Sequence, residues 1–400
     1  MNPTVGIDRL HLYIPPQYID MVDLAEARGI DPNKFIIGIG QDQMAVTDAK
    51  QDIVSMAINA AYPILSEEDK GLIDQVIVAT ESAFDYSKAV SIYLHEALEI
   101  NPFAKCYEIK EACYSGTAAL LSAVDYVRLN PDRKVLVVTT DIARYGLATP
   151  GEATQGAGAI AILVASNPAI FAIGSERLAF TDNQFDFWRP YYEVYPRVEG
   201  KFSTELYNQT FIRVMEEAIA RYPQITQEIK TQIFHLPFTK MGRKAMKAYR
   251  DYLEEAVSSC QEKILALDRW QDHYDQSTLL SRRVGNIYTG SLYLGLLSLL
   301  INAEDLVADD QIGLFSYGSG AVAEFFYGQL QPEFRSALLI DQIQNRFDQR
   351  RRVTVDEYEA IYQEELTQAD EQIEYKSTVM PGDFYLSKID HHRRFYRRHQ

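Results

Sequence analysis

The chain has 400 residues, of which 47% are apolar and 24% are charged, so it has ample material for one large domain or two to three ordinary ones. Its net charge of −17 argues against nucleic-acid binding, which needs clustered Lys and Arg, and its longest apolar run, 292–301, is too short to cross a membrane. Asp8 and Arg9 stand where a secretory signal needs an apolar core, and three widely spaced cysteines give neither a disulfide framework nor metal-ligand spacing, so we expect a cytoplasmic protein without a metal.

Apolar runs rich in Val and Ile alternate with longer helical patterns, which favours an α/β fold. The runs are nearly continuous rather than alternating, as is typical of strands buried on both faces. We predict strands over residues 76–80, 134–140, 160–165, 232–236 and 311–317.

Two stretches of the chain repeat one another, and only the first carries a cysteine. Residues 113–117 (Cys-Tyr-Ser-Gly-Thr) open an apolar helical segment, and residues 287–291 (Ile-Tyr-Thr-Gly-Ser) open another. Further on, 156–161 matches 318–323, and the separation between copies changes only from 174 to 162 residues. The repeat predicts two similar halves, residues 1–168 and 169–400, with the two apolar helices buried between layers.

Two regions lie outside this repeat: residues 181–207 and the charged, helical C-terminal region. Residues 181–207 are dense in aromatic residues and predict a long structured loop. Thr354 and Glu357 form a capping box at the start of a C-terminal helix that contains Tyr358 and Tyr362. Residues 391–400 hold four arginines and predict a frayed, solvated tail rather than a binding site.

Cys113 is the first candidate for chemistry. A free cysteine is most often a small core residue, and we keep that interpretation for Cys106 and Cys260. Cys113, however, precedes Ser115 and Gly116 at a helix start, where the helix dipole favours a thiolate. Its counterpart in the repeat is Ile287, so packing alone does not require sulfur there. We predict a nucleophile.

Two further candidates stand at the carboxyl ends of predicted strands. Glu81 comes after the strand at 76–80, and His235 ends the strand at 232–236. Either alone is more often a structural or solvated residue, but ligands of open α/β sheets gather beyond the carboxyl ends of strands. Together with Cys113, they supply a base, a nucleophile and a proton donor or oxyanion partner.

A basic run and two turns complete the candidate site. Lys240, Lys244 and Lys247 fall on one face if the segment is helical; a wet helix surface is the usual meaning, but beside His235 they can also bind the phosphates of a coenzyme. Asn286 and Ser319 lie in the two repeat motifs of the second half. Each is either a simple turn residue or a residue that contacts a ligand at the same site as Cys113.

These residues resemble those of a known protein family. The chain resembles the 3-hydroxy-3-methylglutaryl-CoA synthases, particularly the bacterial ones, in order from about residue 5 to residue 330. The motifs that carry the resemblance are 38–43 (Gly-Ile-Gly-Gln-Asp-Gln), 80–82 (Thr-Glu-Ser), 108–113 (Glu-Ile-Lys-Glu-Ala-Cys), 186–190 (Asp-Phe-Trp-Arg-Pro), 286–291 (Asn-Ile-Tyr-Thr-Gly-Ser) and 316–320 (Ser-Tyr-Gly-Ser-Gly).

The resemblance implies a thiolase-like α/β fold, two pseudo-symmetric halves in five αβαβα layers, and a homodimer. It implies that Cys113 takes the acetyl group from acetyl-CoA, that Glu81 deprotonates the acetyl methyl, and that His235 polarises acetoacetyl-CoA. Coenzyme A enters as part of the substrates and no separate cofactor is expected. Matches to substrate-site residues are Thr154, Ser203, Lys240, Lys244, Asn286 and Ser319, with Asp186 as a further acid near the site; Pro150 replaces an Asn of animal members.

Three alternatives stay open at this stage. A β-ketoacyl-acyl-carrier-protein synthase of the initiating type has the same fold but needs no base at Glu81. A biosynthetic thiolase uses a second cysteine near the C-terminus, and none follows Cys260. A silent thiolase-fold module has lost a reactive residue, whereas this sequence keeps all three.

Overall fold

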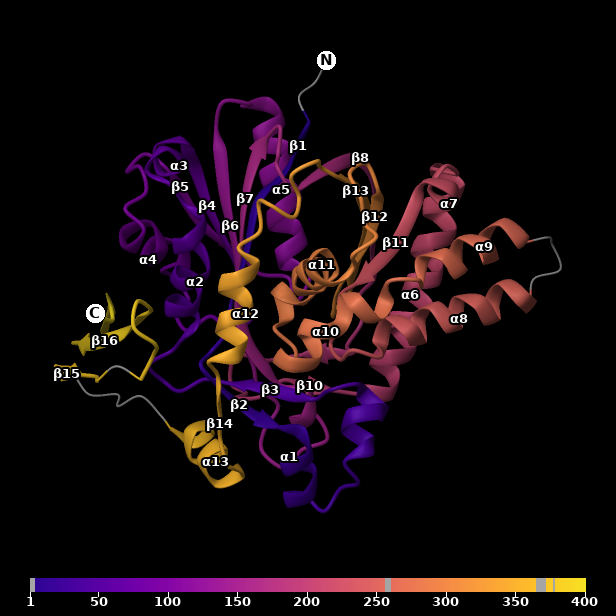
Figure 1. Ribbon diagram of the computed structural model, residues 1–400. Coiled ribbons are helices and arrows are strands. Elements are labelled where there is room, and N and C mark those ends of the chain that lie inside the picture. The colour runs from indigo at the N-terminus through magenta and orange to yellow at the C-terminus, as the bar shows by residue number, and fades with distance from the viewer. Residues whose placement is uncertain (1–3, 256–259, 365–371, 377) are drawn as a thin grey trace.

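A nine-stranded mixed sheet is the frame of the molecule in this computed structural model, which describes residues 4–255, 260–364, 372–376 and 378–400 (Figure 1). The sheet consists of two groups of strands that meet where β1 pairs with β8. The first group, from the centre outward, is β1 (Val5–Tyr13), β7 (Gly156–Ser166), β6 (Lys134–Ala143), β4 (Ile73–Ala79) and β5 (Lys105–Ile109). The second is β8 (Phe171–Thr181), β13 (Val322–Leu330), β12 (Gln311–Gly318) and β11 (Ile229–Phe234).

The two groups share one topology. In each, the first two neighbouring pairs are antiparallel and the third is parallel: β1–β7, β7–β6 and β6–β4 in the first group, β8–β13, β13–β12 and β12–β11 in the second. Strand β5 is an addition at the outer edge of the first group, where it pairs in parallel with β4. The predicted duplication of an α/β fold is therefore confirmed.

Helices cover both groups and also separate them, giving five layers. The outer layer of the first group is α2 (Ile53–Ala61) and α4 (Val90–Ala97); that of the second is α6 (Gly200–Arg221), α8 (Met241–Glu255) and α9 (Gln261–Trp270). Between the groups lie α5 (Ser115–Leu129) and α11 (Ser291–Asn302), with α10 (Tyr274–Val284) against α11 (Figure 1).

The apolar strands explain this layering. On β4, Ile77 belongs to the central core with α5 and α11, whereas its neighbours Val76 and Val78 belong to the outer core with α2 and α4. Both faces of the strand are thus buried, as the continuous apolar run predicts. Every residue of α11 from Ser291 to Leu300 is buried, which confirms the prediction for the central helices.

The helix starts correct the register of the repeat. Helix α5 begins at Ser115 and α11 begins at Ser291, after a 3₁₀ turn at Tyr288–Gly290. Each serine Oγ accepts the N–H of the residue four positions earlier, at 2.6 Å in α5 and 3.0 Å in α11. Counted from these serines, the counterpart of Cys113 is Thr289 and not Ile287. The sequence motif had shifted the match by two residues.

Most of the changed spacing between the repeat copies arises in one connection. In the first half, β6 and β7 are joined by residues 144–155, which include a 3₁₀ turn at Glu152–Thr154; in the second half, residues 319–321 alone join β12 to β13. The long connection of the first half lines the cavity that is described below.

Smaller elements surround this frame. The 181–207 region contains the short hairpin β9 (Phe187–Trp188) and β10 (Arg197–Val198) before α6 begins, so it is not loop throughout. The capping box of Thr354 and Glu357 is confirmed at the start of α13 (Val355–Gln363). The remaining elements are α1 (Met21–Ala27), α3 (Glu67–Leu72), α7 (Ile225–Glu228), α12 (Ile340–Asp348), a π-helix at Lys34–Ile39, a 3₁₀ turn at Tyr62–Ile64, and the sheet of β2 (Gln17–Asp20), β3 (Gln43–Val46) and β14 (Arg351–Arg352).

The predicted frayed tail is wrong. Residues 391–400 contain β17 (Arg393–Arg398), which pairs with β16 (Phe384–Asp390), and β16 also pairs with β15 (Ile373–Glu374). Asp52, the N-cap of α2, accepts hydrogen bonds from Arg394 at 2.7 Å and from the Tyr396 hydroxyl at 2.6 Å, which fixes the tail to the body. In the part of the chain that the structure describes, no helix is long and apolar enough to span a membrane.

Candidate active site

Cys113 and Glu81 are in direct contact at the centre of the molecule. Cys113 lies in the turn before α5, and Glu81 follows the carboxyl end of β4. The thiol Sγ donates to Oε1 of Glu81 at 3.0 Å. The sequence predicted each of these residues for the site by an independent argument, and the structure brings them within hydrogen-bonding distance.

The electrostatics of this pair differ from the expected thiolate. Burial raises the pKa of the Cys113 thiol well above its usual value, and the negative charge of Glu81 acts in the same direction. Burial likewise raises the pKa of Glu81 to about 8, with a further contribution from the charge of Asp141. The expectation that the helix start makes Cys113 a thiolate is therefore wrong: two nearby carboxylates and burial outweigh the helix dipole. The resting pair is a thiol beside a carboxyl group.

Asp141 holds the Glu81 segment in place and was missed by the sequence analysis. It lies in β6 and is fully buried. Its Oδ1 accepts the Glu81 N–H at 2.8 Å and the hydroxyl groups of Thr80 and Ser82 at 3.0 and 2.9 Å; its Oδ2 accepts the Thr289 N–H at 3.1 Å. Burial raises the pKa of Asp141 to about 6, so it remains a carboxylate at neutral pH.

A signal for Asp141 was present in the sequence. It directly follows the predicted strand at 134–140, as Glu81 follows the strand at 76–80. The same argument about strand ends would have selected it.

A cavity of about 520 Å³ opens above Cys113 and contains most of the predicted substrate site. His235, Asn286 and Ser319 line it from the second half of the chain. Thr154 lines it from the 144–155 connection and Ser203 from the first turn of α6. Among the other lining residues, Tyr145, Phe187 and Tyr288 were not predicted and form a cluster of edge-to-face rings.

His235 is neutral and only partly satisfied. It directly follows β11, its N–H donates to the carbonyl of Phe315 at 2.8 Å, and its carbonyl accepts the Tyr207 hydroxyl at 2.8 Å. Burial lowers the pKa of the imidazole to about 3. Its Nδ1 is buried and has no hydrogen-bond partner among the described residues. A neutral ring with spare hydrogen-bonding capacity suits recognition of a carbonyl group.

Asn286 serves both as a turn residue and as a cavity residue. Its Oδ1 accepts the N–H of Tyr288 at 2.8 Å and the hydroxyl of Ser291 at 2.9 Å, which fixes the start of α11. Its Nδ2 donates to the Tyr145 hydroxyl at 3.2 Å. Since an amide nitrogen has two donors, one remains for a ligand.

Asp186 organises the turn that carries Ser319. It is fully buried, and it accepts the Gly320 N–H at 2.9 Å and the Tyr317 hydroxyl at 2.9 Å. Its Oδ2 also lies 3.4 Å from the hydroxyl of Ser203. The acid near the site is thus a buried support for two cavity residues.

The predicted lysines lie outside the cavity. Lys240 is half-buried just before α8, and Lys244 is exposed on that helix. Nζ of Lys244 lies 5.0 Å from the ring centre of Phe238, which lines the cavity, so this lysine stands near its rim. Lys247 pairs with Asp251 at 2.6 Å and belongs to the solvated surface. Cys106 and Cys260 pack against the cores of the first and second halves, as expected.

Comparison with known proteins decides the family. Family models of the hydroxymethylglutaryl-coenzyme A synthase N terminal and C terminal regions match residues 2–169 and 262–399. A hydroxymethylglutaryl-CoA synthase of Enterococcus faecalis is 51% identical over 372 residues, which cover 93% of this chain and 95% of that protein. The chain belongs to the hydroxymethylglutaryl-CoA synthase family.

Solved structures of this synthase family have the same thiolase-like fold. A crystal structure of an HMG-CoA synthase complexed with CoA is 42% identical, has a TM-score of 0.92, and covers 99% of this chain and all of that one. The HMG synthase of the Curacin biosynthetic pathway, in complex with a holo donor acyl carrier protein, is 28% identical with a TM-score of 0.86, covering 99% and 100%.

Proposed function

We propose that the protein condenses acetyl-CoA with acetoacetyl-CoA and water to give 3-hydroxy-3-methylglutaryl-CoA and CoA, in the mevalonate route to isoprenoids. The observation that carries this proposal is the 3.0 Å contact of Cys113 Sγ with Glu81 Oε1 below a cavity that His235 lines. A nucleophilic thiol, a base of raised pKa and a neutral hydrogen-bonding ring are the groups that a condensation of two thioesters needs.

The first step transfers the acetyl group to Cys113. The Cys113 sulfur attacks the thioester carbon of acetyl-CoA. The bond from that carbon to the CoA sulfur breaks, and the proton of the Cys113 thiol passes to the departing CoA thiolate. The N–H of Cys113 and a neighbouring amide hold the oxyanion that forms in between.

The second step forms the carbon–carbon bond. Glu81, in its carboxylate form, removes a proton from the methyl of acetyl-Cys113, and the enolate adds to the ketone carbon of acetoacetyl-CoA. His235 donates a hydrogen bond to that ketone oxygen from its neutral ring, and the proton on Glu81 passes to the alkoxide. A pKa of about 8 suits a group that must both take and give a proton near neutral pH.

The third step releases the product. Water attacks the thioester between Cys113 and the new acyl group, which restores the Cys113 thiol and leaves a free carboxyl group on 3-hydroxy-3-methylglutaryl-CoA. Chain residues and CoA thioesters account for every step of this scheme, so it uses no separate cofactor and no metal.

The substrate-binding residues divide by position. We assign Asn286 and Ser319, which line the same cavity as Cys113, to the acyl portion of the substrate, and Thr154 and Ser203 to the wall along the pantetheine. Lys240 and Lys244, outside the cavity near Phe238, would neutralise CoA phosphates.

We further infer that residues 1–168 and 169–400 are the two thiolase-like halves and that the enzyme is a cytoplasmic homodimer. The proposed division falls between the end of β7 at Ser166 and the start of β8 at Phe171. The segment just before the edge strand β5 carries Phe103, which is 92% exposed, and an exposed aromatic residue near a sheet edge favours contact with a second copy. The cytoplasm would keep Cys113 reduced.

Product analysis tests the function directly. The purified protein is mixed with acetyl-CoA and acetoacetyl-CoA, and 3-hydroxy-3-methylglutaryl-CoA is measured by mass spectrometry. We expect stoichiometric product and free CoA from the wild type and none from Cys113→Ala. Consumption of acetyl-CoA without this product, or equal product from Cys113→Ala, would refute the proposal.

A further inference from the structure

The connection between β6 and β7, residues 144–155, has two faces with different tasks. One face carries Tyr145, Thr149, Pro150 and Thr154 into the wall of the cavity. The other is directed into the protein, where Glu152 and Gln155 are each only 3% exposed. The shape of this connection therefore sets one wall of the substrate cavity.

The backbone of this connection does not follow its intrinsic preference. Ala148 has a φ of +54°, in the left-handed region that favours glycine, and Gly146 has a φ of +99°. Within the connection, Thr149 and Thr154 donate to nearby carbonyl groups at 2.8–3.2 Å, but these bonds are local. An unfavourable backbone conformation persists when surrounding structure holds it.

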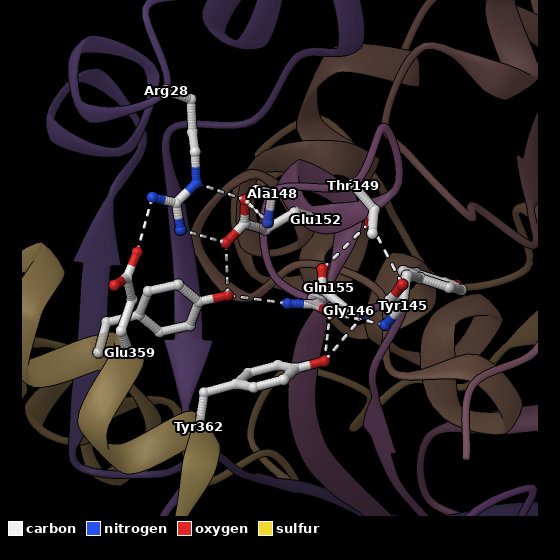
Figure 2. A network of polar contacts seen from close by, with 10 residues as sticks. Arg28, Tyr145, Gly146, Ala148, Thr149, Glu152, Gln155, Glu359 and Tyr362 are labelled. Atoms are coloured by element: carbon white, nitrogen blue, oxygen red, sulfur yellow. Dashed lines mark hydrogen bonds and ion pairs between the residues drawn. The ribbon is translucent and has the colours of Figure 1, made fainter.

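Tyr362 bonds to the start and the end of the connection at once. Its hydroxyl accepts the Gly146 N–H at 2.9 Å and donates to Oε1 of Gln155 at 3.1 Å. The same Oε1 accepts the Tyr145 N–H at 2.6 Å. Figure 2 shows Tyr362 pointing at Gly146 and Gln155 from below the connection.

Tyr358 holds the middle of the connection in the same manner. Its hydroxyl accepts from Nε2 of Gln155 at 2.9 Å and donates to Oε1 of Glu152 at 3.2 Å. Glu152 in turn accepts the Ala148 N–H at 2.9 Å, at the strained position. The Arg28 guanidinium binds both oxygens of Glu152 at 2.8 Å and reaches Glu359 at 2.7 Å (Figure 2).

Both tyrosines come from one face of α13, about two hundred residues later in the chain. They are 2% and 8% exposed. Their rings pack with Ile19, Met44 and Ala153 in a separate core cluster, so removal of the hydroxyl groups leaves the packing in place. Helix α13, which begins at the capping box of Thr354 and Glu357, is therefore linked to the cavity through these two tyrosines.

We propose that Tyr358 and Tyr362 are positioning residues for acyl-CoA binding: their hydroxyl groups hold residues 144–155 in the conformation that forms the cavity wall. The inference rests on the proposed function for the identity of the ligand. It assigns no chemical step to α13, and it predicts an effect on substrate binding rather than on turnover.

The test compares Tyr358→Phe, Tyr362→Phe and the double variant with the wild type. In the double variant we expect amide hydrogen exchange to accelerate in residues 144–155 and to stay unchanged in α5. The KM for acetoacetyl-CoA and the Kd for CoA should rise roughly tenfold, with kcat within about twofold of the wild type. If the double variant does not fold, the single variants provide the same measurements with roughly threefold effects.

Tyr126→Phe is the matched control. It removes a tyrosine hydroxyl that donates to Asp74 at 2.7 Å on the far part of α5, and it should leave both binding constants unchanged. Unaltered exchange in 144–155, or accelerated exchange with unaltered binding constants, would overturn the proposal. So would a loss of kcat without a change in KM. The exchange and CoA-binding measurements need no turnover, so they remain decisive even if no condensation is found.

Discussion

The turns that precede α5 and α11 have the same local structure and opposite surroundings. Counted from the helix starts, Cys113 in the first corresponds to Thr289 in the second. Each turn faces a strand of the other half, and the facing residue is the eighth of its strand in both cases: Asp141 of β6 faces Thr289, and Gly318 of β12 faces the Cys113 turn.

This difference explains why only one turn is reactive. At the second turn, the Asp141 carboxylate accepts both the N–H and the hydroxyl of Thr289, at 3.1 and 2.5 Å. At the first, Gly318 has no side chain to occupy that place, and a Cβ there would lie 2.6 Å from the Tyr114 nitrogen. A duplicated turn binds a carboxylate of the protein in one half, whereas in the other it packs directly against the backbone of a glycine.

Adding a side chain at Gly318, against the Cys113 turn, should have the largest effect. In Gly318→Ala the added Cβ meets backbone of Tyr114 and Glu111 at 2.6–2.9 Å, so the Cys113 turn must move. We expect turnover to fall by about 100-fold, because small displacements of reacting groups cost that much. Gly295→Ala is the control, since its Cβ would meet only ordinary contacts at 3.6–3.8 Å in α11. Normal turnover in Gly318→Ala would show that the close approach of Gly318 to this turn is dispensable.

Replacing the Asp141 carboxylate at the second turn should mainly reduce stability. Asp141→Asn replaces an oxygen that accepts hydrogen bonds with an amide that opposes the N–H of Thr289. We expect the free energy of unfolding to fall by about 3 kcal/mol, measured by urea denaturation. Asp125→Asn, at an exposed ion pair with Arg177, should cost less than about 1 kcal/mol. Equal losses for the two variants would contradict the structural role of Asp141.

The raised pKa of Glu81 should make stability depend on pH. The folded protein keeps a proton on Glu81 up to about pH 8, whereas the unfolded chain releases it near pH 4.5. Stability from this group is therefore full at low pH and declines as pH rises between those values. We expect Glu81→Gln to gain Tm relative to the wild type from pH 5 to pH 8. A difference that stays constant over this range would show that Glu81 has an ordinary pKa.

The smallest effect is expected where the two halves touch across their equivalent helices. Thr117 and Tyr293, each two residues after a helix start, share a hydrogen bond of 2.9 Å, and Thr117 also donates to Ser316 at 2.7 Å. Thr117→Val should lower the free energy of unfolding by about 1 kcal/mol with turnover unchanged. Thr4→Val, at an exposed position just before β1, should be neutral. A loss of turnover in Thr117→Val would mean that the contact also shapes the site.

The fold was predictable where burial is uniform. All five predicted strands occur, at somewhat shifted ends, because both faces of those strands are apolar. The other four strands of the main sheet, β1, β5, β8 and β13, were not predicted; Asp8 and Arg9 interrupt β1, and Ser175 to Arg177 interrupt β8. Asp8 accepts the Ala169 N–H at 3.1 Å, a partner that appears only after folding. The prediction of a solvated tail was wrong for the same reason, because Arg394 bonds to Asp52, a residue far away in the sequence.

The site was predictable where one residue follows one strand. Glu81 and His235 met that criterion, and Cys113 stood out through the repeat. The protonation state of Cys113 was not predictable. A helix start is a local property, whereas the pKa of Cys113 depends on Glu81 and Asp141, which belong to other parts of the sheet. Tyr358 and Tyr362 could not be assigned to the cavity, since nothing near them in sequence indicates the 144–155 connection.

Mass spectrometry of the protein after mixing with acetyl-CoA alone tests the contrast between the two turns most directly. We predict one acetyl group per chain, on the peptide that contains Cys113, with no adduct on the peptide that contains Thr289. The adduct should disappear when acetoacetyl-CoA is added, and in Glu81→Ala it should form but persist. An unmodified Cys113, or an adduct that Glu81→Ala clears at the wild-type rate, would contradict the assignment of nucleophile and base.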